Sequence, residues 1–159
     1  MKPITYEQAL HRMAAYCSRA ERCIHDIRQK LTRWELTLDQ QNKIIQHLQK
    51  EKFLDEIRFC RAFVNDKSKY NQWGNYKIKY ELKKKNIPED LIKEALQAIN
   101  PKESRKQLCQ LLQNKKKNIK GKNDFEIKQK LIRFAASRGF SLEEIEKALC
   151  EQKSPLDSQ

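Results

Sequence analysis

The sequence has few of the residues that interrupt helices. It contains three Gly and four Pro in 159 residues, whereas sheet proteins and irregular folds use such residues at many turns. Lys, Glu, Gln, Leu and Ile, which favour helices or pack on their faces, are abundant. We therefore predict an all-α fold, in a chain too short for a large multidomain enzyme.

Long apolar runs are also absent. No stretch approaches the roughly 20 apolar residues that a membrane-spanning helix needs. Residues 1–7 reach a polar helix start without the apolar segment of a signal peptide. We therefore expect a cytoplasmic protein that does not associate with membranes.

The five cysteines form no disulfide or metal-binding pattern. They stand at positions 17, 23, 60, 109 and 150, and an odd, scattered set is typical of reduced thiols that fill the core of a cytosolic protein. Cys17, Cys23 and His25 come closest to a metal site, but their spacing matches no common zinc motif. We predict no metal and no cofactor.

The sequence also lacks a catalytic motif. It contains no GxSxG, HExxH, P-loop or GxGxxG pattern. Adjacent carboxylates occur three times, each at an expected helix start, where capping and the helix dipole account for them. These pairs are Asp55-Glu56, Glu89-Asp90 and Glu143-Glu144. We predict that the protein is not an enzyme and has no catalytic residues.

What the sequence does contain is a series of helix starts. A capping residue followed three positions later by Glu or Gln predicts five of them: Thr5 with Gln8, Ser18 with Glu21, Thr37 with Gln40, Asn123 with Glu126, and Ser141 with Glu144. Pro88 and Pro101, each as a first helical residue, predict two more. Asp55 and the turn at Trp73-Gly74-Asn75 bring the total to about nine short helices.

The nine helices fall into three similar sets. Three segments align at separations of about 50 residues: Ile27-Arg28-Gln29-Lys30-Leu31, Ile78-Lys79-Tyr80-Glu81-Leu82 and Ile127-Lys128-Gln129-Lys130-Leu131. The preceding helices carry apolar stripes at Leu10, Met13, Ala14 and Cys17, at Leu54, Ile57, Cys60 and Val64, and at Leu108, Leu111 and Leu112. We predict three tandem three-helix repeats, residues 1–52, 53–99 and 100–150, stacked into an elongated, curved array, with a flexible tail over 151–159.

Basic residues outnumber acidic ones, 34 to 21, which gives a formal charge of +13. This charge favours a polyanion or an acidic protein surface as the partner. The candidate binding residues are the clustered lysines and two tyrosines among them: Lys67, Lys69, Tyr76, Lys77, Tyr80, Lys83, Lys84, Lys115, Lys116, Lys117, Lys120 and Lys122. Tyr70 and Trp73 also interleave with these charges, as in surfaces that combine phosphate contacts with stacking.

Two interpretations of this basic region remain open at the level of sequence. Trp73 and Tyr80 are either exposed binding residues or core residues beneath a solvated lysine face. Residues 115–122 contain Gly121 and little apolar periodicity, so we predict an exposed mobile loop whose cations are accessible.

Two parts of the sequence form a distinctive pattern. The first is residues 15–21 together with 26–31. The second is Phe53-Leu54-Asp55-Glu56-Ile57-Arg58-Phe59-Cys60-Arg61-Ala62-Phe63-Val64, followed by Gly74, Ile78, Glu81, Leu82 and Ile87. Both resemble the RecX family, and the second is the better match. Asn86 stands where the family usually has a helix-ending Gly, and Asn also tolerates the left-handed conformation.

The resemblance implies a monomeric negative regulator of the RecA recombinase, with a role in DNA recombination, DNA repair and the SOS response. Such a protein binds in the groove of the RecA filament on single-stranded DNA and inhibits the ATPase, strand exchange and coprotease activities of RecA. The first alternative is a helical protein that binds bare DNA without sequence preference and without RecA. The second is a scaffold that recognises peptides through a repeat groove.

Overall fold

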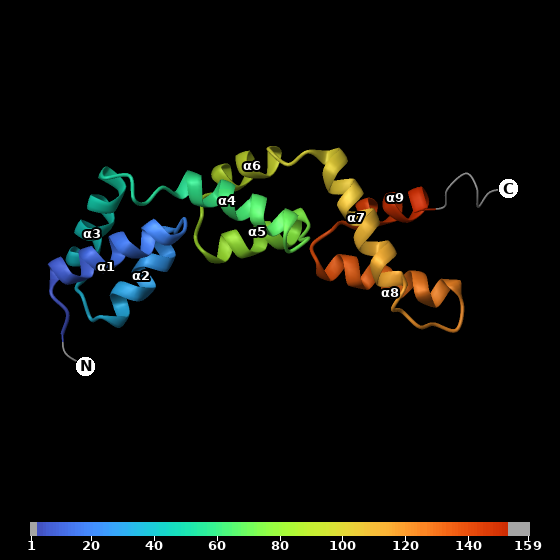
Figure 1. Ribbon diagram of the computed structural model, residues 1–159, viewed down its shortest axis with the longest axis horizontal. Coiled ribbons are helices and arrows are strands. Elements are labelled where there is room, and N and C mark those ends of the chain that lie inside the picture. Colours follow the sequence, from blue (N-terminus) through green and yellow to red (C-terminus); the bar gives the residue numbers. More distant parts are fainter. Residues whose placement is uncertain (1–2, 153–159) are drawn as a thin grey trace. The chain divides into compact units, whose positions relative to one another are not determined.

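The computed structural model describes residues 3–152, and in that range it contains nine α-helices and no strand (Figure 1). The helices are α1 (Tyr6–Arg19), α2 (Ile24–Arg33), α3 (Leu38–Lys50), α4 (Glu56–Lys69), α5 (Asn75–Lys84), α6 (Glu89–Gln97), α7 (Pro101–Lys116), α8 (Asp124–Ser137) and α9 (Leu142–Gln152). The all-α prediction is confirmed. Of the predicted tail, residues 151 and 152 belong to α9, and residues 153–159 lie outside the described range.

Most of the predicted capping residues begin a helix. Thr5 and Thr37 form complete capping boxes with Gln8 and Gln40. Two further caps are confirmed. The Glu144 amide donates to the Ser141 hydroxyl and the Ser141 amide donates to the Glu144 carboxylate. The side chain of Asn123 accepts from the Glu126 amide. Each cap satisfies amides that the first helical turn leaves without a partner.

The predicted start at Ser18 is wrong. Ser18 lies in the last turn of α1, and its hydroxyl donates to the Ala15 carbonyl at 2.7 Å. Glu21 does not cap a helix either, because its carboxylate pairs with Arg58. Helix α2 begins later, after Cys23, whose side chain makes no capping hydrogen bond.

The two helices predicted from a proline begin at different positions relative to that proline. Asn100 caps α7, and Pro101 is the first helical residue, as predicted. Pro88, in contrast, stands immediately before α6, and its carbonyl accepts the Ile92 amide at 3.2 Å. The carboxylate of Asp55 accepts the amides of Ile57 and Arg58 and so caps α4, in agreement with the sequence.

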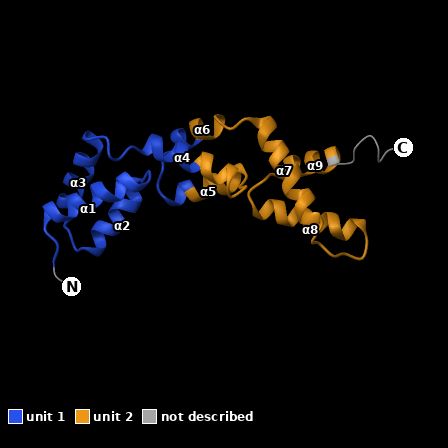
Figure 2. Ribbon diagram, in the orientation of Figure 1, with its two compact units in different colours: residues 1–63, 82–92 blue, residues 64–81, 93–159 orange. Residues whose placement is uncertain are grey.

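The chain forms two compact units (Figure 2). Unit 1 comprises residues 1–63 and 82–92, and unit 2 comprises residues 64–81 and 93–159. The division passes through α4, α5 and α6. Unit 1 therefore contains α1–α3 and parts of α4, α5 and α6. Unit 2 contains α7–α9 and the remaining parts of α4, α5 and α6.

Each unit has a core of aliphatic side chains. In unit 1, α3 packs against α1 and α2, around the fully buried residues Met13, Ile27, Leu31, Ile44 and Leu48. In unit 2, α7 packs against α8 and α9, around Leu108, Leu112, Leu131, Ala135 and Ile145. These residues confirm the predicted apolar stripes of α1 and α7.

One predicted stripe is partly wrong. Ile57 is 42% exposed, whereas Phe59 and Cys60 are buried. The apolar side of α4 is therefore rotated away from Ile57 toward Phe59, whose ring lies 5.7 Å from that of Phe63. Ile57, Phe59 and Cys60 fall within four residues, so the sequence left open which of them faces the core.

Helices α2, α5 and α8, each the second helix of a predicted repeat, end in the same kind of turn. Glu35 (φ 60°), Asn86 (φ 60°) and Gly139 (φ 98°) each adopt the left-handed conformation after the helix. The next residue is buried, and its amide donates to a carbonyl five residues earlier: Leu36 to Leu31, Ile87 to Leu82, and Phe140 to Ala135. We call these the first, second and third helix-end turns. Aligned on the turns, Leu131 rather than Ile127 corresponds to Ile78, because α8 has an additional turn at its start.

Candidate binding surface

Two lysines surround the indole ring of Trp73 in unit 2. The Nζ atoms of Lys67, in the last turn of α4, and Lys77, in the first turn of α5, lie 4.9 Å and 4.6 Å from the ring centroid. The link between the helices is held by the Trp73 amide, which donates to the Lys67 carbonyl at 3.0 Å. Because the ring is half-buried, it fixes two positive charges at one place on the surface.

Tyrosine side chains are exposed close to this cation–aromatic group in the sequence. Tyr70, Tyr76 and Tyr80 are 80%, 66% and 61% exposed. Tyr76 and Tyr80 are four residues apart on α5, so they lie on the same side of that helix. Of the two residues that the sequence left undecided between the surface and the core, Tyr80 therefore lies at the surface. Trp73 is half-buried.

A contact between two glycines holds the start of α5 against the end of α8. The Gly74 amide donates to the Arg138 carbonyl at 2.7 Å, and the Tyr76 amide donates to the Gly139 carbonyl at 3.0 Å. A Cβ atom added to Gly74 would lie 2.5 Å from the Gly139 carbonyl carbon. The backbones can approach this closely only because neither residue has a side chain.

Helices α7 and α8 of the same unit carry a second cation–aromatic group. The guanidinium of Arg138 lies 5.3 Å from the ring centroid of Phe134, and the Nζ of Lys115 lies 4.8 Å from it. Arg138 also donates to the Asn71 carbonyl at 3.0 Å, just before Trp73 in the chain. Arg138 and Phe134 were missed by sequence reasoning, although the Arg138-Gly139-Phe140 sequence is a recognisable helix end.

The predicted loop at 115–122 is partly helical. Lys115 and Lys116 form the last turn of α7, and Lys115 is half-buried against Phe134. Lys117, Lys120 and Lys122 follow the helix and are exposed, as predicted. The helix extends further because residues 113–117 contain good helix formers and no capping glycine.

Lys83 and Lys84 belong to unit 1, at the end of α5. Both are exposed, and the Nζ of Lys83 lies 3.7 Å from a carboxylate oxygen of Glu89. Lys69, in unit 2, is exposed in the last turn of α4. Exposed ion pairs such as Lys83–Glu89 contribute little to stability.

A more buried ion pair joins α2 to the end of α5 in unit 1. The Nζ of Lys85 lies 2.8 Å from Oδ1 of Asp26, and the two side chains are 29% and 18% exposed. Burial raises the pKa of Asp26, but hydrogen bonds from Lys85 and Cys23 and the positive charge of Lys85 outweigh it, so the pKa lies below its ordinary value. For Lys85, burial lowers the pKa, and the contact with Asp26 outweighs it and raises the pKa.

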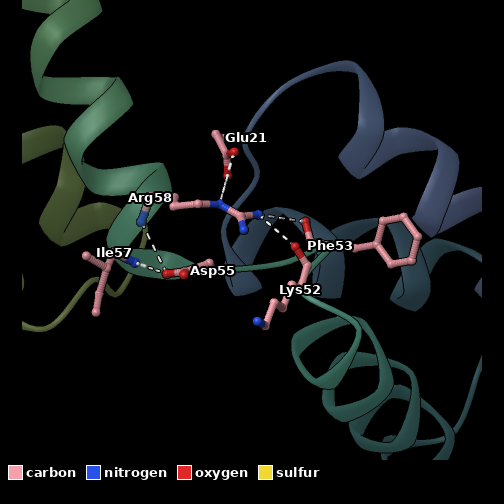
Figure 3. A network of polar contacts seen from close by, with 6 residues as sticks. All are labelled: Glu21, Lys52, Phe53, Asp55, Ile57 and Arg58. Atoms are coloured by element: carbon pink, nitrogen blue, oxygen red, sulfur yellow. Dashed lines mark hydrogen bonds and ion pairs between the residues drawn. The ribbon is translucent and has the colours of Figure 1, made fainter.

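Two further contacts in unit 1 link residues of α4 to the region between α1 and α2. Nε of Arg58 donates to both carboxylate oxygens of Glu21 at 3.2 Å, and its Nη2 donates to the Lys52 carbonyl at 2.9 Å (Figure 3). The Glu56 carboxylate accepts the Ile24 amide at 3.1 Å. It thus supplies the cap that α2 lacks, and burial raises its pKa.

The five cysteines all lie within residues 3–152, form no disulfide there and occupy different environments. Cys17, Cys23 and Cys60 are buried as predicted, whereas Cys109 is half-buried and Cys150 is exposed, so the prediction that all five fill the core is wrong for Cys150. Burial raises the pKa of Cys23 to about 12. Within residues 3–152, no group of three or more His, Cys, Asp or Glu side chains is placed to hold a metal ion, and no helix is long and apolar enough to cross a membrane.

Comparison with known proteins identifies the family. One family model, described as the second three-helix domain of RecX, matches residues 55–96, and another, described as the third, matches residues 103–149. "Regulatory protein RecX" of Haemophilus ducreyi is 33% identical over 116 residues, which are 73% of this chain and 74% of that protein. The chain belongs to the RecX family. The RecX protein of Prosthecochloris aestuarii is 29% identical over 91% of this chain and 93% of its own length.

Some RecX relatives are longer. "Regulatory protein RecX" of Bacillus pumilus is 34% identical over 86% of this chain, but the match spans only 52% of that protein. Two solved RecX structures share the fold. One has a TM-score of 0.82 at 22% identity and covers 90% of this chain, and the other, from Lactobacillus salivarius, has a TM-score of 0.78 at 19% identity and covers 92%. The tandem three-helix architecture predicted from the sequence is therefore confirmed.

Proposed function

We propose that this protein is a negative regulator of RecA. In this proposal it binds in the groove of the RecA filament on single-stranded DNA and inhibits the ATPase, strand exchange and coprotease activities of RecA. It acts as a cytoplasmic monomer and does no chemistry itself. The observation that carries the proposal is the membership of the RecX family, whose members are named regulatory proteins.

The two cation–aromatic groups of unit 2 are the proposed contacts with the filament. Lys67 and Lys77 around Trp73, and Lys115 and Arg138 around Phe134, hold four positive charges against aromatic rings. Ordered charges lose less side-chain entropy on binding than mobile ones. The exposed Tyr70, Tyr76 and Tyr80 extend the surface with groups that stack on bases or pack against protein.

The remaining basic residues contribute electrostatic attraction in this proposal. They are Lys69, Lys83, Lys84, Lys116, Lys117, Lys120 and Lys122. A net charge of +13 accelerates association with a polyanionic filament, and mutation of a peripheral charge changes mainly the association rate. We further propose that residues 1–52, 53–99 and 100–150 are the three repeats through which the chain contacts successive parts of the filament.

The alternative function is binding to bare DNA without RecA. The cation–aromatic groups favour it as a second candidate, because lysine with aromatic residues suits phosphate contact and base stacking on any single strand. A bare-DNA binder that neutralises several phosphates loses affinity steeply as salt rises. A comparison of the two targets at one salt concentration, high enough to weaken contacts with phosphate alone, therefore distinguishes the two functions.

The experiment is a pair of titrations at matched salt, one with bare oligo(dT) and one with RecA filaments assembled on the same oligonucleotide. We expect the protein to bind the filament at least tenfold more tightly than bare DNA at about 0.15 M salt, where screening weakens contacts with phosphate alone. Equal affinity for the two would contradict the RecA proposal and support the bare-DNA function.

A further inference from the structure

Unit 1 has its own group of cations that lie on aromatic rings. The guanidinium carbon of Arg22 lies 3.7 Å from the ring centroid of Tyr16, and Nζ of Lys30 lies 4.6 Å from the same centroid. The guanidinium carbon of Arg12 lies 5.6 Å from the ring centroid of Trp34. All five residues belong to unit 1, and none of them was a candidate binding residue in the sequence. We call them the α1–α2 strip.

The strip follows α1 on one side and the end of α2 on the other. Arg12 and Tyr16 are four residues apart on α1, so they lie on the same side of that helix, about 6 Å apart along its axis. Their partners, Trp34 and Lys30, are also four residues apart, but they follow in the reverse order. The two segments therefore run in opposite directions here, and cations alternate with rings both along the strip and across it.

The rings hold the cations of the strip in place. Tyr16 and Trp34 are half-buried and pack against the core of unit 1. Nε of Arg22 also donates to the Tyr16 carbonyl at 3.1 Å, so the guanidinium is fixed by the backbone as well as by the ring. A contact with an aromatic ring orders a cation and leaves its charge intact. An ordered cation loses less side-chain entropy when it binds an anion.

No carboxylate neutralises the cations of the strip. In the part of the chain that the structure describes, its two arginines and its lysine form no ion pair. Residues 6–34 contain six Lys or Arg and three Asp or Glu. Of these three carboxylates, Glu21 pairs with Arg58. Asp26 pairs with Lys85. Because both partners come from outside residues 6–34, the strip keeps an excess of positive charge.

We propose that the α1–α2 strip binds the backbone of single-stranded DNA, with Arg12, Arg22 and Lys30 on phosphate oxygens. A guanidinium group can give a phosphate two parallel N–H donors. A single strand is flexible enough to bring successive phosphates to cations one helical turn apart, and its unpaired bases contact the exposed parts of Tyr16 and Trp34. A duplex has no unpaired base for these rings, and an acidic protein surface has none either. The inference does not require RecA, so it goes beyond the proposed function.

The test measures binding to labelled oligo(dT) by fluorescence anisotropy at several salt concentrations between about 0.02 M and 0.15 M. The strip variant carries Arg12→Gln and Lys30→Gln, which remove two of the three charges. The matched control carries Lys43→Gln and Lys50→Gln, because both lysines are exposed on α3 of the same unit and the loss of charge is identical. Thermal unfolding verifies that both variants are folded.

The salt dependence reports the number of phosphate contacts. Each contact with a single strand contributes about 0.7 to the slope of log K against log salt concentration. We expect the strip variant to lose about 1.4 from this slope and to bind oligo(dT) at least about tenfold more weakly at about 0.05 M salt. The control variant should keep the slope of the unaltered protein and bind within about threefold of it.

Three results would overturn the inference. The first is an unchanged slope in the strip variant, and weaker binding of that variant to RecA filaments would then assign the strip to a protein surface. The second is an equal loss on a duplex of the same length, which would contradict the preference for a single strand. The third is no binding of the unaltered protein to oligo(dT) even at about 0.02 M salt. None of these results affects the proposed function, which fails only if the protein does not bind the filament.

Discussion

At the scale of single residues, the Asp26–Lys85 pair shows that not every lysine of this basic protein is a solvent-exposed surface charge. Lys85 belongs to the same basic run as Lys83 and Lys84 in the sequence, yet it is the one that is partly buried on a carboxylate. Its aliphatic stem also brings Nζ to 5.9 Å from the Phe59 ring centroid. This lysine is therefore a structural residue, and no pattern in the sequence distinguishes it from its neighbours.

Asp26→Asn tests the stability of this contact. We expect the free energy of unfolding at pH 7 to fall by about 1–2 kcal/mol, because a charge-assisted hydrogen bond in a half-buried site is lost. The folded-state pKa of Asp26 is depressed, so its contribution is present above the ordinary pKa of 3.8 and is lost as the pH falls through the lower folded-state value. Denaturant unfolding at pH 7 and again at about pH 2 measures both effects.

The control is Glu143→Gln, which removes a carboxylate from the exposed pair with Lys147. We expect it to change the free energy of unfolding by less than about 0.5 kcal/mol. A loss in the Asp26→Asn variant that is equally large at both pH values would show that the contact is not electrostatic.

Sequence reasoning at the residue scale succeeded where one residue type has one dominant role. Thr5, Thr37 and Ser141 cap helices as predicted, because the capping hydrogen bond is made within three residues. Ser18 matched the same pattern but is inside α1. The carboxylate that the pattern required, Glu21, has its partner Arg58 37 residues away, and no local pattern contains that information.

At the scale of helices, the contact between Gly74 and Gly139 determines how α5 and α8 meet. The sequence marked Gly74 only as a turn residue before α5, and Gly139 was not singled out from the sequence. A contact of two backbones depends on the absence of side chains at two positions 65 residues apart. Such a pair is recognisable only when the structure brings the two residues together.

Gly74→Ala tests this contact. The added Cβ would lie 2.5 Å from backbone atoms of Gly139, so the two helices must separate, and we expect the free energy of unfolding to fall by about 1–3 kcal/mol. Hydrogen exchange at the Gly74 and Tyr76 amide positions locates the effect, since both donate across the contact. We expect position 74 to exchange faster, together with the Tyr76 amide.

Gly121→Ala is the matched control in the same unit. Its Cβ would first meet Cγ1 of Ile127, a side-chain atom that can move, so we expect a smaller loss of stability, below about 1 kcal/mol. Equal losses in the two variants, with unchanged exchange at Tyr76, would contradict the proposed importance of the glycine contact.

At the scale of the whole molecule, the repeat pattern was the most informative feature of the sequence. The period of about 50 residues, together with the segment 53–64, predicted the three-helix architecture and the family. The alignment of the third repeat was shifted by one helical turn, since Ile127 was matched in place of Leu131. The third repeat has an extra turn at the start of α8, and Nζ of Lys130 in that helix donates to the Lys120 carbonyl.

The candidate binding surface was predicted only in part. The basic clustering identified Lys67 and Lys77, and the exposure of Tyr76 and Tyr80 agrees with a binding role. Arg138 and Phe134 were not predicted, because they are more than 50 residues from Trp73 in the chain, and it is the fold that brings Arg138 to the Asn71 carbonyl. Clusters that depend on tertiary contacts are not visible as runs in a sequence.

The measurement that tests the central proposal most directly is the ATPase rate of RecA on single-stranded DNA, titrated with this protein and with two double variants. One variant carries Lys67→Glu and Lys77→Glu. The other carries Lys93→Glu and Lys147→Glu, which make the same charge change at exposed positions of unit 2 on α6 and α9.

We predict inhibition by the unaltered protein at or below one molecule per RecA subunit. The Lys67 and Lys77 variant should require at least tenfold more protein for the same inhibition, and the control variant less than about threefold more. No inhibition by the unaltered protein, at a salt concentration where it binds bare DNA strongly, would contradict the proposal and leave a general DNA-binding protein.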